Sequence, residues 1–249
     1  MIYTICVIKI QTLGGVIVFF DWTYIVLVMP AVIFSLWASI KVNSTFKKYS
    51  SFRPSSGMTG AEAARRVLDA NGLYNVRIER ISGNLTDHFD PRTNVIRLSD
   101  SVYGVSSAAA IGVAAHEAGH AVQYAKGYVP LKLRNAIIPV TNLGSRLAMP
   151  LILLGLLFSS VGQHFVYVAY AGIICFALST VFQLLTLPTE FNASRRALAS
   201  IESSELLYGS ELDAAKKVLS AAAMTYVAAL AVSIMQLLHL ISIVGGRRR

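Results

Sequence analysis

Three long stretches without a charged residue limit the possible folds of this chain more than any other feature. They cover residues 22–40, 147–189 and 218–246. An α-helix needs about 20 apolar residues to cross a hydrocarbon core about 30 Å thick. The first and last stretches can each supply one such helix. The 43 residues of the middle stretch can supply two, with a turn near 159–164. The sequence therefore predicts a mostly α, polytopic membrane protein with about four transmembrane helices.

The composition agrees with a membrane protein and disfavours two other classes. Hydrophobic residues make up 55% of the 249 residues and charged residues only 14%, against about 25% in soluble domains. So few charges cannot cover a soluble surface, which disfavours both a cytosolic enzyme and a disordered chain. Cys6 and Cys175 lie in apolar segments, so they are interpreted as small buried hydrophobes rather than as a disulfide framework.

The first apolar stretch is interpreted as a retained span rather than a cleaved signal peptide. Trp22, Tyr24 and Trp37 lie near its two ends, and aromatic residues favour the membrane interface. The stretch is too long for the core of a signal peptide, and no small-residue cleavage site follows it cleanly. The span can begin before Asp21, because residues 16–20 are also apolar.

The net charge of +9, from 22 basic and 13 acidic residues, has two interpretations. One is nucleic-acid binding. The other is the positive-inside rule, which we favour because most basic residues lie between the apolar stretches; no nucleic-acid partner is expected. Ten basic residues flank the spans on the side of the polar region, and Lys9 and 247–249 supply four on the other. This predicts a cytoplasmic polar region and external termini; the terminal arginines fit only if the last helix is buried or re-entrant.

Residues 41–103 read as a small α+β region that faces water. Thr59 and Glu62 have the spacing of a capping box, which predicts a helix over 61–70 that ends at Asn71. The alternation of residues predicts two strands, and polar turn residues separate them. The strands are expected at 76–81 and 94–98, and the turn at 87–91.

An HExxH motif lies in a helix expected over 106–124. Positions i and i+4 share one face of a helix, so His116 and His120 can both reach one metal ion, and imidazole suits zinc. Glu117 projects just off that face, where it can take a proton from a zinc-activated water without being a ligand. Three ionisable groups in an otherwise apolar helix are costly without a metal or a partner, so the helix is expected to be buried in protein around a metal site.

A hydrolytic zinc site needs a third protein ligand and one open position. No histidine follows the motif closely enough, because the next one is His164. Glu190 is the best carboxylate, directly after a predicted span. The same residue can equally be a solvated glutamate in the first turn of a helix, with Pro188 at its start. Residue chemistry alone leaves both interpretations open.

The sequence resembles the YugP-like family of neutral membrane zinc metallopeptidases. The likeness is carried by HEAGHAVQ at 116–123, by an apolar hairpin, and by PTEFNASRRAL at 188–198. The stretches at 87–92 and 221–226 also resemble that family, and the likeness runs from about Met58 to the end of the last span. More distantly, the arrangement is similar to HtpX-like membrane proteases, which are gluzincins.

The resemblance implies one Zn²⁺ per chain with His116, His120 and Glu190 as ligands and Glu117 as the general base. HtpX-like proteins usually carry an aspartate four residues after the ligand glutamate, where it orients a zinc-bound histidine. Ser194 occupies that position here, so the residue that supports the ligands is open.

Other polar residues are candidates for roles at the site or the membrane. His88 is a candidate for the oxyanion or a substrate carbonyl, although a polar turn residue is the simpler interpretation. Asp87 and Asp90 are candidates for the missing supporting carboxylate. Arg195 and Arg196 can pair with a substrate carboxylate or lipid phosphates, but membrane-flanking charge is favoured. His239 is interpreted as a helix-packing residue.

The predicted function is membrane-embedded, zinc-dependent endopeptidase activity. The resemblance suits membrane-associated or misfolded polypeptides as substrates, beside the lipid bilayer. Either predicted strand could bind an extended peptide by strand addition. The alternatives are a non-catalytic zinc-binding membrane protein and a metal transporter. Five domains are expected in chain order. They are an N-terminal transmembrane segment (1–42), a catalytic α+β region (43–135) and a transmembrane hairpin (136–189). A third-ligand helix with its connector (190–217) and a C-terminal apolar helix with a basic tail (218–249) follow.

Overall fold

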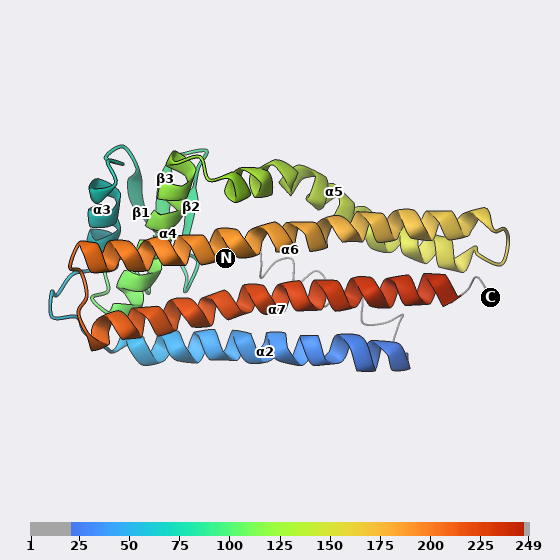
Figure 1. The fold of residues 1–249 in the computed structure, drawn as a ribbon, viewed down its shortest axis with the longest axis horizontal. Helices are drawn as coiled ribbons and strands as arrows, with labels where there is room; N and C mark the ends of the chain where they lie inside the picture. Colours follow the sequence, from blue (N-terminus) through green and yellow to red (C-terminus); the bar gives the residue numbers. More distant parts are fainter. Residues whose placement is uncertain (1–20, 247–249) are drawn as a thin grey trace. The chain divides into compact units, whose positions relative to one another are not determined.

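The computed structural model describes residues 21–246. Interpretations that concern Cys6, Lys9, an earlier start of the first span or the terminal arginines lie outside these residues. The helices and strands in chain order are α2 (Trp22–Ser50), α3 (Gly60–Ala70), β1 (Arg77–Ile81), β2 (His88–Asp90), β3 (Val95–Ser99), α4 (Ala108–Ala125), α5 (Val129–Leu157), α6 (His164–Ser203) and α7 (Ser210–Gly246) (Figure 1).

Four of these helices, α2, α5, α6 and α7, are long and apolar enough to cross a membrane. This confirms the prediction of a mostly α, polytopic membrane protein, and α5 and α6 are separated at the predicted turn. Large apolar side chains remain exposed along the four helices, among them Ile33, Leu143 and Ile174. Soluble proteins rarely expose extended apolar surface, so lipid is the solvent that suits these helices.

Helix α6 continues through the position where one interpretation of Glu190 placed a helix start. It runs through Pro188 to Ser203, so of the two interpretations left open, the one that placed Glu190 in the solvated first turn of a helix is wrong. Pro188 removes one i→i−4 hydrogen bond. The helix persists because the turns that follow are packed, with Ala193, Ala197 and Ile201 fully buried. Tertiary packing thus overrides the local stop signal.

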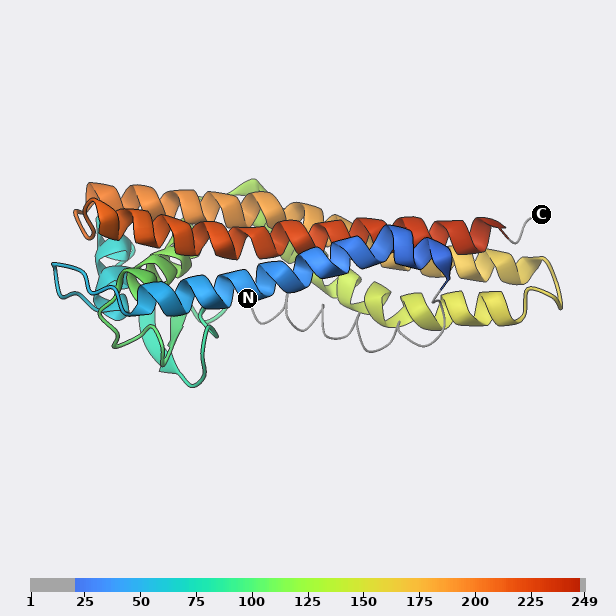
Figure 2. The same cartoon turned by 90° about the horizontal axis from the view of Figure 1, so that it is seen from below.

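Contacts divide the chain into two compact units. The described residues of the first unit are 38–132 and 188–225, and those of the second are 21–37, 133–187 and 226–246. The second unit consists of segments of α2, α5, α6 and α7, whose axes are roughly aligned with one another (Figure 2). Backbones approach closely there, because a Cβ on Gly172 would lie 2.7 Å from the carbonyl oxygen of Ala148. Small residues at helix contacts are typical of membrane helices.

His239 is a buried residue of this second unit. Its Nδ1 lies 3.1 Å from Thr23 Oγ1, and its ring meets that of Tyr24 edge-on at 5.2 Å between centroids. These contacts agree with the interpretation of His239 as a helix-packing residue.

The first unit contains a three-stranded sheet in the order β1-β3-β2. Strand β3 is parallel to β1 and antiparallel to β2. The two strands predicted from alternation are confirmed within one residue at each end. Because β3 is paired on both sides, the idea that residues 94–98 could add a peptide strand is wrong. The outer strands are β1 and β2.

Strand β2 was not expected, since its composition predicted a turn. The turn chemistry is present but comes just after the strand: Asp90 accepts hydrogen bonds from the Arg92 N–H at 3.0 Å and from Thr93 Oγ1 at 2.8 Å. The strand itself forms because Phe89 pairs with Ile96 of β3 and packs against the apolar core of the unit. Pairing with a distant segment decided the structure here.

Helices α3 and α4 pack against each other beside the sheet. The predicted capping box of α3 is present, with Thr59 and Glu62 bonded reciprocally. The N-terminus of α4 is capped by Ser107, whose Oγ accepts from the Ala110 N–H at 3.1 Å. Most residues of α4 are buried, which confirms that the HExxH helix lies inside protein. Its alanines belong to the apolar core of the unit.

Candidate metal centre

Helix α4 presents two imidazoles side by side on one face. His116 and His120 are one turn apart, and their ring centroids lie 4.7 Å from each other at an angle of 87° between the planes. Both are partly buried, with 12% of each side chain exposed. The i,i+4 spacing of the sequence motif thus produces the expected pair.

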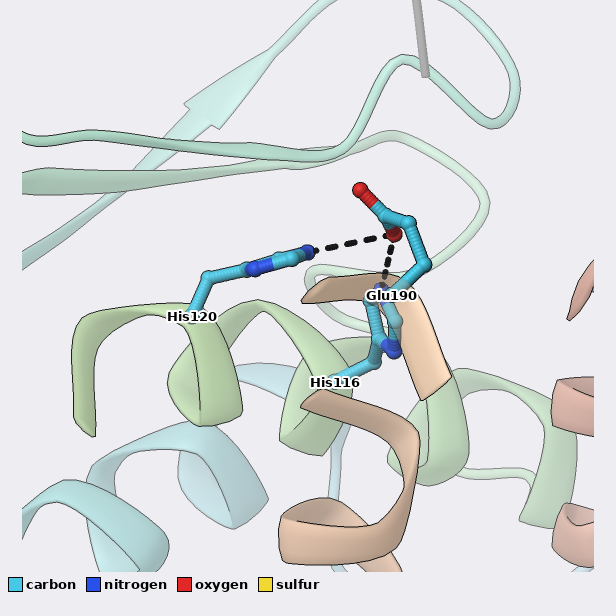
Figure 3. Close-up of side chains that lie close together, drawn as sticks. All are labelled: His116, His120 and Glu190. Carbon is cyan, nitrogen blue, oxygen red and sulfur yellow. Dashed lines mark hydrogen bonds and ion pairs between the residues drawn. The ribbon is translucent and has the colours of Figure 1, made fainter. Parts of the chain in front are cut away.

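Glu190 reaches the same place from α6. Its Oε2 lies 3.2 Å from His116 Nε2 and 3.4 Å from His120 Nε2. Figure 3 shows the carboxylate between the two rings, with both Nε2 atoms directed toward it. The glutamate side chain is 5% exposed, so the three donors form a nearly enclosed cluster. A glutamate held inside a helix between two histidines is not a solvated surface residue.

These three side chains fit a zinc ion. They are a group of His, Cys, Asp or Glu residues whose potential ligand atoms lie within 4.8 Å of one another. Zinc binds imidazole nitrogen and carboxylate oxygen at about 2.0–2.2 Å, so neighbouring tetrahedral ligands are about 3.3 Å apart. The observed separations of 3.2 and 3.4 Å match that requirement. The N₂O donor set is also one that catalytic zinc sites use.

Close packing of α4 on α6 brings the glutamate within reach. A Cβ on Gly119 would lie 2.7 Å from the carbonyl oxygen of Ala193, which is closer than any side chain permits. Gly119 lies next to His120, and Ala193 lies one turn after Glu190. The glycine inside the HExxH motif therefore sets the distance between the two helices that carry the donors.

Glu117 is buried beside strand β2. Its side chain is on α4, and its Oε2 accepts a hydrogen bond from the main-chain N–H of Phe89 at 3.1 Å. The residue is 8% exposed. Glu117 is thus next in sequence to the candidate ligand His116 and is held at the edge of the sheet; its role as a general base stays a prediction.

Two comparisons place this chain among known proteins. The family described as "Putative neutral zinc metallopeptidase" matches residues 24–245. "Putative membrane protease YugP" of Bacillus subtilis (strain 168) is 49% identical over 225 residues, which cover 90% of this chain and 98% of that protein. The chain belongs to this zinc metallopeptidase family. The family resemblance of the sequence is thereby confirmed. No solved structure gave a significant match.

Three residues were predicted as possible supports of the zinc ligands, and of these Ser194 lies beside a candidate ligand. Its Oγ is 3.1 Å from His116 Nδ1. A histidine ligand commonly donates its second N–H to such a group, which fixes the ring. The serine that replaces the usual aspartate can therefore accept a hydrogen bond from His116, and its supporting role stays a prediction.

Asp87 and Asp90 direct their oxygens elsewhere. Asp87 is buried and accepts from the N–H of Ser99 at 2.7 Å and from its Oγ at 3.0 Å. Burial raises the pKa of the Asp87 carboxyl to about 6, and the negative charge of Glu117 adds to the rise against the opposing hydrogen bonds from Ser99. Asp90 forms an ion pair with Arg97 at 3.3 Å. Neither arrangement resembles the expected support of a histidine ligand.

His88 lies on β2 and is not one of the three clustered donors. Its Nδ1 is 2.9 Å from the carbonyl oxygen of Thr86, a local contact that fits the simpler interpretation. A role toward substrate stays a prediction.

Gln123 is a polar residue at the site that was not predicted from the sequence. Its Oε1 lies 3.0 Å from Nδ1 of His120. The available signal was weak but real, because an amide three residues after a histidine shares its helix face in an otherwise apolar segment. Its other partners lie on α6, and no local pattern indicates them.

Proposed function

We propose that this chain is a membrane-embedded, zinc-dependent endopeptidase of the gluzincin type. The supporting observation is the convergence of His116, His120 and Glu190 at ligand spacing, with Glu117 next in sequence and held at the edge of the sheet. Membership of the zinc metallopeptidase family supports the same activity. One zinc ion would be held by the two imidazoles and the Glu190 carboxylate, with one position left for water.

The proposed mechanism assigns the proton transfers to Glu117. Zinc, when bound, would acidify a water molecule and polarise the substrate carbonyl. Glu117 accepts the proton as the water oxygen attacks the peptide carbon, and then delivers it to the amine that leaves. Phe89 holds the base in place by its N–H, and the low exposure of Glu190 keeps bulk water from the donors.

An extended polypeptide is the proposed substrate, bound along β2. This strand is the outer neighbour of β3, and the Phe89 N–H on its outward side already reaches Glu117. An outer strand can pair with an extended peptide through main-chain hydrogen bonds, which would bring a peptide bond to the base. Membrane-associated or misfolded proteins are the proposed source, with the site on the cytoplasmic side.

Replacement of the base tests the proposal. Glu117→Gln keeps the shape and an oxygen for the Phe89 N–H but cannot accept a proton. In detergent-purified protein we expect zinc content to stay at one per chain while casein hydrolysis falls by about two orders of magnitude or more. Glu202→Gln, an exposed change on α6, should leave both values unchanged.

Zinc content, casein hydrolysis and zinc uptake into proteoliposomes, measured on the same two proteins, separate the two alternatives. A non-catalytic zinc protein would bind zinc without hydrolysing casein, before and after the substitution. A transporter would move zinc into proteoliposomes at a rate that does not depend on Glu117. Near-normal casein turnover in Glu117→Gln would remove the proposed base.

A further inference from the structure

A fully buried amide connects the two helices that carry the zinc donors. Gln123 lies on α4 and is 0% exposed. An uncharged polar side chain in such a place is costly unless its hydrogen bonds are satisfied. Its amide has three partners: His120 on its own helix, and Thr189 and Asn192 on α6.

The α6 partners determine which way the amide points. Gln123 Nε2 lies 2.8 Å from the carbonyl oxygen of Thr189, and a carbonyl only accepts hydrogen bonds. It also lies 3.0 Å from Asn192 Oδ1. That oxygen accepts a second bond, at 2.7 Å, from the Nε of Arg196, and a guanidinium only donates. Two obligatory directions therefore turn the Gln123 nitrogen toward α6.

The amide oxygen must then face His120. Gln123 Oε1 lies 3.0 Å from His120 Nδ1, and an amide oxygen only accepts, so Nδ1 must carry the proton. In the neutral ring this leaves the Nε2 lone pair to bind a metal. Nε2 is the atom 3.4 Å from Glu190 Oε2, on the side where the donors converge.

We infer that Gln123 is a positioning residue that holds His120 in the tautomer and orientation of a metal ligand, with Thr189, Asn192 and Arg196 fixing the amide. The inference rests on the proposed zinc site. It also gives Arg196 a structural role, in addition to the membrane-flanking charge expected for it. Together with Ser194 beside His116, it places an uncharged hydrogen-bonding side chain beside each imidazole.

Two substitutions of Gln123 separate this role from a simple link between helices. Gln123→Met removes every hydrogen bond at similar volume. Gln123→Glu presents an oxygen to His120 whichever way it turns, but cannot donate to Thr189 or Asn192. Gln183 is a second buried glutamine (4% exposed), and it lies on α6. Gln183→Met is therefore the matched control for the loss of a buried amide.

The measurement is the zinc dissociation constant of the folded, detergent-purified protein, with the visible spectrum of the Co²⁺-substituted protein as a readout of ligand geometry. We expect Gln123→Met to weaken zinc binding by about 10–100-fold and to alter the cobalt bands. Gln123→Glu should bind zinc within a few-fold of the parent, and Gln183→Met should match the parent in both measurements.

Three results would overturn the inference. An unchanged dissociation constant in Gln123→Met removes the role. Equal weakening in the Met and Glu variants assigns Gln123 to the link between α4 and α6 alone. If Gln123→Met does not fold, weak zinc binding by Gln123→Glu likewise removes the positioning role. A parent that binds zinc without hydrolysing casein would refute the proposed activity but not this inference, whereas a parent that binds no zinc would refute both.

Discussion

The main-chain N–H of Phe89 donates a hydrogen bond to Oε2 of Glu117, with 3.1 Å between the two atoms. This bond joins the HExxH helix to the outer strand of the sheet. It gives the proposed base a fixed position relative to the strand along which a peptide can pair. The Phe89 ring also lies 6.0 Å from that of Tyr124, one turn after His120 on α4, so apolar surface continues from the strand to the helix.

Removal of Glu190 should abolish zinc binding as well as hydrolysis. Glu190→Ala leaves two imidazoles and no carboxylate, which is too few ligands for a catalytic zinc site. We expect zinc content to fall from one per chain to nearly none, measured by elemental analysis after dialysis. Glu202→Ala, an exposed change further along α6, should retain zinc. Unchanged zinc coordination by X-ray absorption in Glu190→Ala would contradict the ligand assignment.

The parts of this structure that depend on local sequence could be predicted, whereas those that depend on contacts between distant segments could not. The HExxH spacing, the capping box at Thr59 and the apolar spans each act within a few turns, and each is found. Strand β2 was missed because it exists only through pairing with β3. Gln123 was missed because two of its partners, Thr189 and Asn192, lie on another helix.

The helix start considered at Pro188 is absent for a related reason. Proline in a sequence favours a helix start or a break, and local evidence could not show that the following turns are buried in the first unit. The third ligand illustrates the limit: residue chemistry left Glu190 undecided, and only the packing of α6 on α4 brings it to the histidines.

Gly119 should tolerate a methyl group much less well than Gly112 on the same helix. Alanine normally stabilises a helix by up to about 1 kcal/mol over glycine. At Gly119 the new Cβ would lie 2.7 Å from a backbone oxygen of α6, whereas at Gly112 it would lie 3.3 Å from the Ala215 side chain. Overpacking costs about 1–3 kcal/mol, which exceeds the helix gain at Gly119, whereas the looser contact at Gly112 makes the cost there smaller.

We therefore expect Gly119→Ala to lower the unfolding temperature in detergent and to weaken zinc binding, because α6 must move away with Glu190. Gly112→Ala should bind zinc as the parent does and unfold at a higher temperature than Gly119→Ala. Equal zinc affinity in the two variants would show that the close approach at Gly119 does not position the ligand.

The ionisation of Asp87 should lower the free energy of unfolding as the pH rises from about 4 to about 6. Burial raises the pKa of this carboxyl from 3.8 to about 6, so the folded protein holds the proton more tightly than the unfolded chain. The resulting stabilisation is fully present below pH 3.8 and is lost as the pH rises through about 6. Its size is at most about 3 kcal/mol.

Asp87→Asn should remove this fall, because asparagine is isosteric and has no ionisable proton. Thermal unfolding in detergent between about pH 4 and 7 measures the effect. Asp100→Asn is a control with the opposite sign. A hydrogen bond from Arg80 lowers the pKa of Asp100, so the stabilisation that this residue provides grows as the pH rises, and its replacement removes that growth. An identical pH dependence in Asp87→Asn and the parent would refute the prediction.

The orientation in the membrane is the last prediction, and it follows from basic residues at the ends of the spans. Ten of these flank the spans on the side that holds HExxH, and short basic flanks favour the cytoplasm. The ten are Lys41, Lys47, Lys48, Lys132, Arg134, Arg146, Arg195, Arg196, Lys216 and Lys217. The four on the other side lie outside the described residues.

Reporter fusions can test this orientation. Residues after Gly127, in the turn between α4 and α5, should be cytoplasmic, so alkaline phosphatase fused there should be inactive and a green fluorescent protein should fluoresce. One span later, a fusion after Ser160 between α5 and α6 should give the opposite pair of signals. The reverse pattern at both positions would place the metal centre outside the cytoplasm, while the donor geometry of His116, His120 and Glu190 would still favour zinc.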